Sequence, residues 1–194
     1  MDNYKLNGFG KFSGGEYYDV TINGIGTLNG ELNCNSLNVN GVFTSNNLIR
    51  VKNEISINGR VRFNENVKCS KLALQGIMKC NENFEAEEVK IEGILTVEKE
   101  MNVGSIEISS ARFSIRELHA DIIKINDLHK IRTFNKMYEI GEIECTSIEA
   151  DSLKCKKISA GNVKLGKNVE VELVEYSDTV DIDPRAKVGA VIKV

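Results

Sequence analysis

Residues 55–76 read ISINGRVRFNENVKCSKLALQG and contain one complete repeat of this 194-residue chain. The repeat begins and ends with the same phrase: an apolar residue, any residue, an apolar residue, a polar residue and glycine. It occurs as ISING, ending at Gly59, and as LALQG, ending at Gly76. A period of about 17 residues is typical of a repeat architecture, so this stretch predicts a structural unit that is copied along the chain.

The same phrase recurs through the first two thirds of the sequence. It ends at six glycines that are 16, 17, 18, 17 and 17 residues apart, and it continues twice more at this period without the glycine. The glycines are Gly8, Gly24, Gly41, Gly59, Gly76 and Gly93, and the two later phrases end at Ser110 and Asp127. Eight registers at nearly one period indicate a solenoid of stacked coils.

Each coil contains pairs of apolar residues separated by one residue. In the repeat of Gly59 the pairs are Ile55 with Ile57, Val61 with Phe63, and Val67 with Cys69. Alternation with period 2 is typical of a short strand with one buried face, and the spacings of 3 and 4 that a helix needs are missing. Three strands per coil predict an all-β fold, a three-sided right-handed parallel β-helix with about 17 residues per coil. The handedness is inferred from the coil rhythm and from the family resemblance given below.

Asparagine precedes the glycine in four of the phrases, at positions 7, 23, 40 and 58. Asn followed by Gly predicts a tight corner, because both residues tolerate a left-handed backbone. Asparagines at one position of successive coils are also expected to hydrogen-bond to each other, as in other stacked β structures.

The repeat is interrupted after Asn126. Residues 127–142 read DLHKIRTFNKMYEIGE, with apolar residues spaced by threes, and predict a loop or short helical insertion. Apolar pairs resume at Ile143 with a spacing that is mostly five residues, which predicts coils of about 15 to 16 residues. We therefore expect one domain over residues 1–194, interrupted at about 127–142.

Composition narrows the function classes. The formal net charge is -3, so no basic field attracts nucleic acid, and no nucleic-acid partner is expected. No apolar run approaches the length of a bilayer span, and the N-terminus does not read as a signal peptide. The expected location is the cytoplasm, where the five cysteines would remain reduced thiols.

The sequence predicts no enzyme, no cofactor and no metal site. His119 and His129 could suggest a hexapeptide acyltransferase. Those enzymes need an apolar residue every six positions, whereas the inward residues here come in pairs that are 6, 6 and 5 residues apart. We therefore interpret both histidines as surface residues. The segment carrying His129 is where an active site would be sought. Asp178, Asp181 and Asp183 are interpreted as a solvated strand face rather than a calcium site.

Five cysteines fall on inward positions as small hydrophobic residues: Cys34, Cys69, Cys80, Cys145 and Cys155.

The two ends of the solenoid are the predicted functional surfaces. One coil cannot bury enough apolar surface to stand alone, and an end coil leaves a strand edge that must be covered or paired. No amphipathic capping helix is visible at either end. We therefore expect end-to-end stacking through two groups of apolar residues, which are Leu6, Phe9 and Phe12 at one end and Val188, Val191 and Ile192 at the other.

With these repeats in view, the sequence resembles the bactofilins, the polymer-forming cytoskeletal proteins of bacteria. The resemblance rests on the glycine-ended phrases and on residues 164–189, KLGKNVEVELVEYSDTVDIDPRAKVG, whose core is LVEYSDTVDID at 173–183. It implies a right-handed β-helix that polymerises without nucleotide, often end to end into non-polar filaments. It also implies a role in cell shape, envelope organisation or scaffolding.

The same resemblance bears on partners and location. The expected partner is a second copy of the chain, as homopolymer or homodimer, while scaffolded or envelope proteins stay unidentified. Many family members carry disordered tails, some with a membrane-targeting segment, and this sequence shows none, so membrane association is doubtful. A position near the inner face of the membrane stays open. The alternatives are a non-polymerising β-helix that binds a protein or polysaccharide and, third, an enzyme of the hexapeptide transferase or polysaccharide lyase kind.

Overall fold

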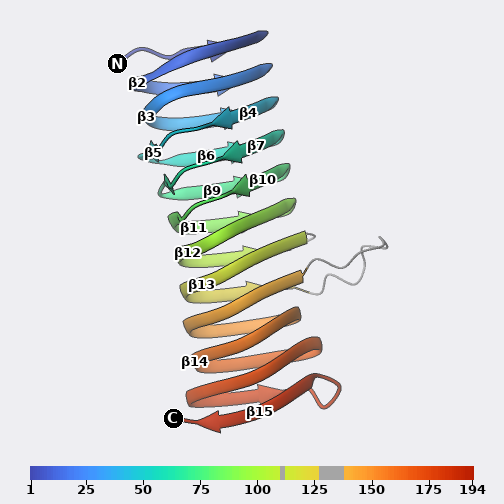
Figure 1. The fold of residues 1–194 in the computed structure, drawn as a ribbon. Coiled ribbons are helices and arrows are strands. Elements are labelled where there is room, and N and C mark those ends of the chain that lie inside the picture. The colour runs from blue at the N-terminus through green and yellow to red at the C-terminus, as the bar shows by residue number, and fades with distance from the viewer. Residues whose placement is uncertain (110–111, 127–137) are drawn as a thin grey trace.

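The chain forms a right-handed parallel β-helix of about 10 turns, with corresponding positions about 17 residues apart (Figure 1). The computed structural model describes residues 1–109, 112–126 and 138–194, and these residues contain strands but no helix. The predicted fold class is confirmed. Within this described part, no helix has the length and hydropathy that crossing a bilayer requires.

The strands follow one another down a single rod. Several of them run through two or three sides of a coil without a break. Their bounds are β1 (Tyr4–Leu6), β2 (Phe9–Ile22), β3 (Ile25–Val39), β4 (Val42–Ser45), β5 (Ile49–Val51), β6 (Glu54–Ile57), β7 (Arg60–Phe63), β8 (Val67–Lys68), β9 (Lys71–Leu74), β10 (Ile77–Cys80), β11 (Phe84–Ile91), β12 (Ile94–Ile108), β13 (Arg112–Ile125), β14 (Tyr138–Ile182) and β15 (Lys187–Lys193).

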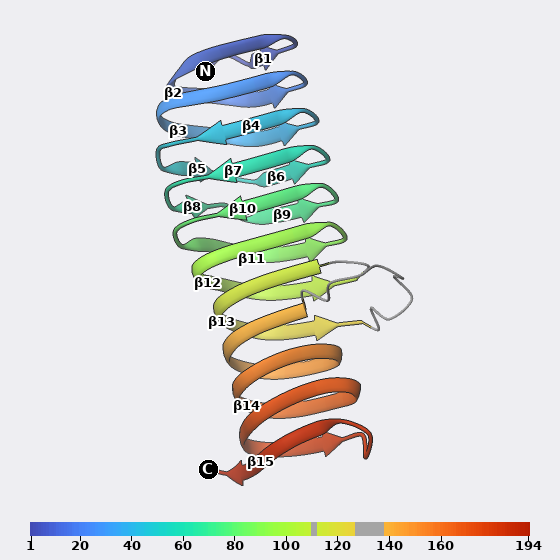
Figure 2. The same ribbon diagram turned by 45° about the vertical axis from the view of Figure 1, so that its right-hand side comes forward.

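The middle coils show the three sides most clearly. Strands β4, β5 and β6 make one coil, and they pair in parallel with β7, β8 and β9 of the next coil, respectively (Figure 2). Each side of the rod is therefore a parallel sheet in which every strand pairs with the equivalent strand one coil earlier and one coil later. The apolar pairs of the Gly59 repeat, in β6, β7 and β8, point inward as predicted: Ile55, Ile57, Val61, Phe63 and Val67 are 0–1% exposed.

The glycines of the repeat are required by the close approach of neighbouring coils. A Cβ atom built on Gly24, Gly41, Gly59, Gly76 or Gly93 would lie 1.9–2.1 Å from the carbonyl oxygen of the glycine one coil earlier. The expectation of a left-handed backbone at these corners is wrong. Among the glycines of the described residues, φ is positive only at Gly15 and Gly30, which lie at another corner.

The predicted asparagine ladder is present at the same corner. The Asn23 side-chain amide donates to Asn7 Oδ1 at 2.9 Å, Asn40 donates to Asn23 at 3.0 Å, and Asn58 donates to Asn40 at 3.2 Å. Each amide thus links one coil to the coil before it.

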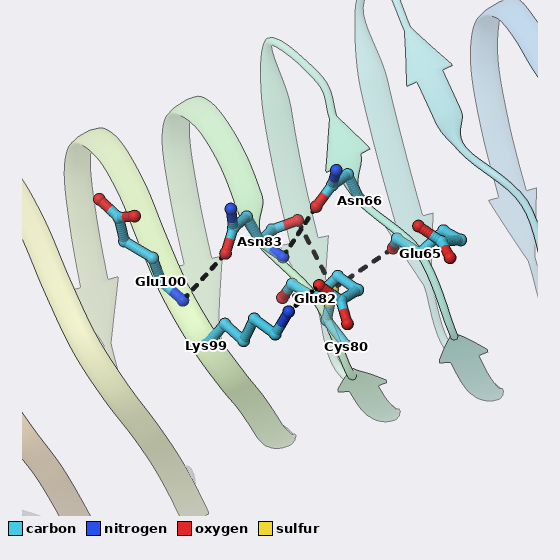
Figure 3. Close-up of polar contacts among 7 residues, drawn as sticks. All are labelled: Glu65, Asn66, Cys80, Glu82, Asn83, Lys99 and Glu100. Carbon is cyan, nitrogen blue, oxygen red and sulfur yellow. Dashed lines mark hydrogen bonds and ion pairs between the residues drawn. The ribbon is translucent and has the colours of Figure 1, made fainter.

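Asparagines also bridge a second corner, the one that precedes β8 and β11. Asn83 N–H donates to Asn66 Oδ1 at 3.1 Å, and Glu100 N–H donates to Asn83 Oδ1 at 3.4 Å (Figure 3). Lys99, next to Glu100, forms an ion pair with Glu82, next to Asn83, and so links the second and third of these coils. Side-chain amides therefore satisfy backbone donors where the strand ladder is interrupted.

Part of the predicted insertion is regular strand. Residues 127–137 lie outside the described part of the chain, but residues 138–142 belong to β14, and Tyr138–Ile140 pairs with Phe113–Ile115. Ile140 is 0% exposed and occupies the inward column of Ile115. The apolar residues spaced by threes run from position 128 to Ile140, and this spacing concealed the strand alternation of Tyr138 and Ile140. The next coils are short, as their spacing predicts: Lys164 contacts Glu149, 15 residues earlier, and Ser159 contacts Glu175, 16 residues later. The last coil has 17 residues instead of the predicted 15 to 16, since Val171 pairs with Val188.

Candidate assembly surfaces at the ends of the solenoid

The N-terminal end is covered by aromatic rings. The ring of Tyr4, in β1, stacks on Phe12 with a centroid distance of 4.4 Å and an interplanar angle of 21°, and Tyr17 packs against Tyr4 at 5.6 Å. Phe12 is consequently only 7% exposed, so its assignment to the open end is corrected: Tyr4 covers it. Leu6 is partly buried against the core and remains at the end.

Phe9 lies on a side of the rod rather than on its end. It pairs in register with Ile25, and Ile25 pairs with Val42, so the three side chains form one outward column. Their exposed fractions are 86%, 45% and 39%, and Arg60 continues the column in the next coil. The predicted role of Phe9 in the end rung is therefore corrected to a place in a lateral apolar stripe.

The C-terminal end presents aliphatic side chains. β15 pairs in parallel with β14, placing Val188 beside Val171 and Val191 beside Val174. Val171 and Val174 are 2% and 0% exposed because β15 lies over them, whereas Val191, with no coil beyond it, is 45% exposed. Val188 is partly buried. Both valines therefore continue inward columns into the end surface.

The predicted place of Ile192 is also corrected. It pairs with Glu175, whose carboxylate forms an outward ion pair with Lys157 at 2.9 Å. Ile192 is 48% exposed and lies in this outward column, next to the end surface but not in it. Ile192 follows Val191 directly, so the alternation of a strand directs the two side chains to opposite faces.

Tyr4, Tyr17, Val180 and Ile182 are end-coil residues that the sequence analysis did not single out. All four are partly buried and pack against the core at one end or the other. The inward columns already contain Tyr4, Val180 and Ile182, so counting the repeat into the first and last coils would have found them. Tyr17 could not be found in this way, because its ring folds back onto Tyr4 by tertiary packing.

The aspartates near the C-terminus do not converge. Asp183 accepts hydrogen bonds from the Arg185 backbone N–H and guanidinium at 2.8–2.9 Å, and these bonds lower the pKa of Asp183 to about 2. Asp178 and Asp181 are exposed. Among the described residues, no group of three or more His, Cys, Asp or Glu side chains is placed to hold a metal ion.

His119 lies between two carboxylates on one side of the rod. Its Nε2 is 3.5 Å from Glu100 Oε1 and its Nδ1 is 3.4 Å from Glu144 Oε2, each belonging to a neighbouring coil. The side chain borders a shallow groove of about 770 Å³ whose lining includes Cys69, Ala86 and Cys145. His129, the other candidate, lies outside the described residues.

The cysteines are thiols placed mainly in the core, as predicted. Cys34, Cys69, Cys80 and Cys155 are 0–7% exposed, and all five cysteines are free. Cys145 differs, because it is only partly buried and lines the groove. Burial raises the pKa of each of the five thiols to about 12.

We expect the native protein to resist thiol alkylation. With a pKa of about 12, the thiolate fraction at pH 8 is about a thousandfold lower than for an ordinary thiol of pKa 9. Iodoacetamide followed by mass spectrometry should show five modified cysteines in guanidinium chloride and, under native conditions, slow modification that begins at Cys145. Cys145→Ser should remove this first site. Fast native labelling of Cys80 would contradict the burial.

Comparisons of the chain with protein-family models, curated proteins and solved structures found no match. A proposal about function therefore has to start from the fold, the two end surfaces and the sides of the rod.

Proposed function

We propose that this chain is a bactofilin-like structural protein that assembles end to end, without nucleotide, into a cytoskeletal filament for cell shape or envelope organisation. The main support is the last coil. Its inward valines, Val188 and Val191, continue columns that are buried one coil earlier, and β15 pairs on only one of its edges in the described structure. An exposed strand edge beside apolar side chains is a surface that readily pairs with another chain.

The sides of the rod contrast with its ends. Ion pairs link neighbouring coils along the outside, for example Lys68 with Glu85 at 2.8 Å and Lys71 with Glu88 at 2.9 Å, and these four side chains are 49–68% exposed. Charged side chains on exposed faces disfavour sideways aggregation. Association at the ends is therefore favoured over association at most of the lateral surface.

The proposal has consequences for partners and location. The partner at each end is a second copy of the chain, and the filament needs no cofactor and no catalysis. We propose that the filament lies in the cytoplasm, near the inner face of the membrane, and scaffolds other proteins there.

Val191→Lys should abolish assembly. Stacking on the C-terminal coil would bury the new ammonium group without a partner, which is costly in an apolar contact. Negative-stain electron microscopy of the purified chain over a concentration series should show filaments for the wild type and discrete particles for the variant.

Ile192→Lys is the matched control, because the neighbouring side chain faces the side of the rod and its lysine stays in water. This variant should still form filaments. Discrete wild-type particles at all concentrations would overturn the proposal. So would Val191→Lys filaments indistinguishable from those of the wild type.

A second candidate function has one specific observation in its favour. The groove beside His119 runs across several coils and is bordered by Lys68, Glu85 and Glu144. A groove of this kind suits a binding module for a protein or polysaccharide chain. This candidate predicts a small, non-polymerising species whose binding is weakened by substitutions along the groove.

A further inference from the structure

One side of the rod carries basic side chains without acidic ones. It contains β4, β7 and β10, which lie one above the other (Figure 2). The strands pair in register from residues 9–11 in the first coil to residues 112–114, so their outward side chains form two columns. The basic residues of the two columns are Lys11, Arg60, Arg62, Lys79 and Arg112. The other outward residues are apolar, threonine or serine, and we call this surface the basic face.

Most of this positive charge is not neutralised within the subunit. Lys11, Arg60 and Arg62 are exposed, and none of them forms an ion pair with a residue that the structure describes. Lys79 is paired at the border of the face, with Glu98 at 2.6 Å. The other two sides of the rod differ, because they carry the ion pairs described above, in which a lysine of one coil contacts a glutamate of the next. The net charge of -3 for the whole chain therefore conceals one side with a positive potential.

Apolar side chains lie beside the basic ones on this face. The lateral apolar stripe of Phe9, Ile25 and Val42 is part of it, with exposed fractions of 86%, 45% and 39%. Ile77 and Ile94 continue the same column and are half-buried. An aromatic ring that is 86% exposed contributes little to the stability of the subunit, so the fold gives no reason for it. Contiguous exposed apolar side chains mark a surface that binds a partner.

The partner that fits this face is extended, negatively charged and apolar beneath its charge. At a strand spacing of about 4.8 Å, the face is about 29 Å long. A bilayer with anionic phospholipids offers phosphate groups to the basic side chains and, directly beneath them, acyl chains to the apolar side chains. Nucleic acid would pair with the basic residues but would leave Phe9 in water. A small anion would contact only one or two of the basic residues and would leave the rest of the face uncovered.

We propose that the basic face binds the surface of a membrane that contains anionic lipids, with the axis of the rod parallel to the bilayer. Arg60 and Arg62 contact lipid phosphates, and the ring of Phe9 enters the headgroup region. This inference rests on the proposed location near the membrane and names the surface that makes the contact. It does not need end-to-end assembly, because a single subunit carries the whole face.

Vesicle flotation tests the basic face. The purified chain is mixed with vesicles of pure phosphatidylcholine, or of phosphatidylcholine and phosphatidylglycerol in equal amounts. Bound protein rises with the vesicles through a density gradient, whereas filaments alone do not rise. The wild type should float with the anionic vesicles and stay behind with the neutral ones. Arg60→Gln combined with Arg62→Gln should weaken the apparent affinity about thirtyfold, because each basic residue near an anionic surface contributes about fivefold.

Arg50→Gln combined with Lys52→Gln is the matched control, because it removes the same charge from β5 and the corner after it, on another side of the rod. This variant should bind the anionic vesicles as the wild type does. Phe9→Ala should weaken binding about tenfold through the loss of buried apolar area. The replaced side chains are exposed, so all these variants should melt at the wild-type temperature.

The outcomes separate this inference from the proposed assembly. A wild type that polymerises but does not float with anionic vesicles overturns the membrane contact and leaves assembly standing. A wild type that floats but never polymerises supports the membrane contact and overturns assembly. Equal weakening by the control pair would show that total charge, and not the basic face, governs binding.

Two further results would assign the basic face to another partner and overturn the membrane contact. The first is unchanged vesicle binding of Phe9→Ala together with displacement of the vesicles by a DNA oligonucleotide, which would indicate nucleic acid. The second is a dimer of the Val191→Lys variant in light scattering that Phe9→Ala dissociates, because a second copy would then cover the face.

Discussion

Gly59→Ala should destabilise the subunit by about 3 kcal/mol or more, one of the largest effects that a single methyl group can have. The new Cβ atom would lie 1.9 Å from Gly41 O, and Gly41 C and N are also within 2.9 Å. These are backbone atoms held by coil-to-coil hydrogen bonds, from Arg60 N–H to Gly41 O at 2.8 Å and from Gly41 N–H to Ile22 O at 3.2 Å, so they cannot turn aside as a side chain would. The two coils must separate locally.

Gly8→Ala is the matched control, since the residue occupies the same position of the same phrase but faces open space. It should change the stability of the subunit by less than about 0.5 kcal/mol. Both variants are compared by thermal melting in the Val191→Lys background, so that assembly does not add to the measured stability. The melting temperature of Gly59→Ala should fall by roughly 6–12 °C, at about 2–4 °C per kcal/mol for a chain of this size. Equal effects at the two glycines would show that the cost is a backbone propensity and not a collision between coils.

Phe63→Ala should cost about 3–5 kcal/mol. Phe63 is 0% exposed and packs edge-on against Phe43 with a centroid distance of 6.2 Å, and Phe43 continues to Phe12 at 6.1 Å. Removal of this ring leaves a cavity between coils whose strands are fixed by the ladder on either side, so the walls cannot collapse into it. Because each coil is stabilised by its neighbours, the loss affects the coils on both sides.

Urea unfolding followed by far-ultraviolet circular dichroism measures this loss. Phe9→Ala is the control, because Phe9 is 86% exposed and its removal should change the free energy of unfolding by less than about 0.5 kcal/mol. Phe63→Leu should recover most of the loss. A Phe63→Ala variant that unfolds at the wild-type urea concentration would contradict a close-packed interior at this coil.

The end surfaces show where prediction from the sequence succeeded and where it failed. Val188 and Val191 lie in the end coil and continue inward columns, because the period of 2 decides which side chains of a strand share a face; their role in assembly stays a prediction. Phe12 and Phe9 were misassigned for different reasons. Phe12 is buried by the ring of Tyr4, and the two rings meet only because the chain coils between them. Phe9 points outward because the strand alternation restarts after the corner at Gly8.

The spacing of apolar pairs and glycines in the sequence determined the three-sided parallel β-helix, the period of about 17 residues and the inward columns, because strand alternation and coil length are local properties. Only the tertiary structure decided why the glycines are needed, which asparagines bridge coils, and which end residues are open. These depend on contacts between residues about 17 positions apart, and such contacts exist only after the coils have stacked.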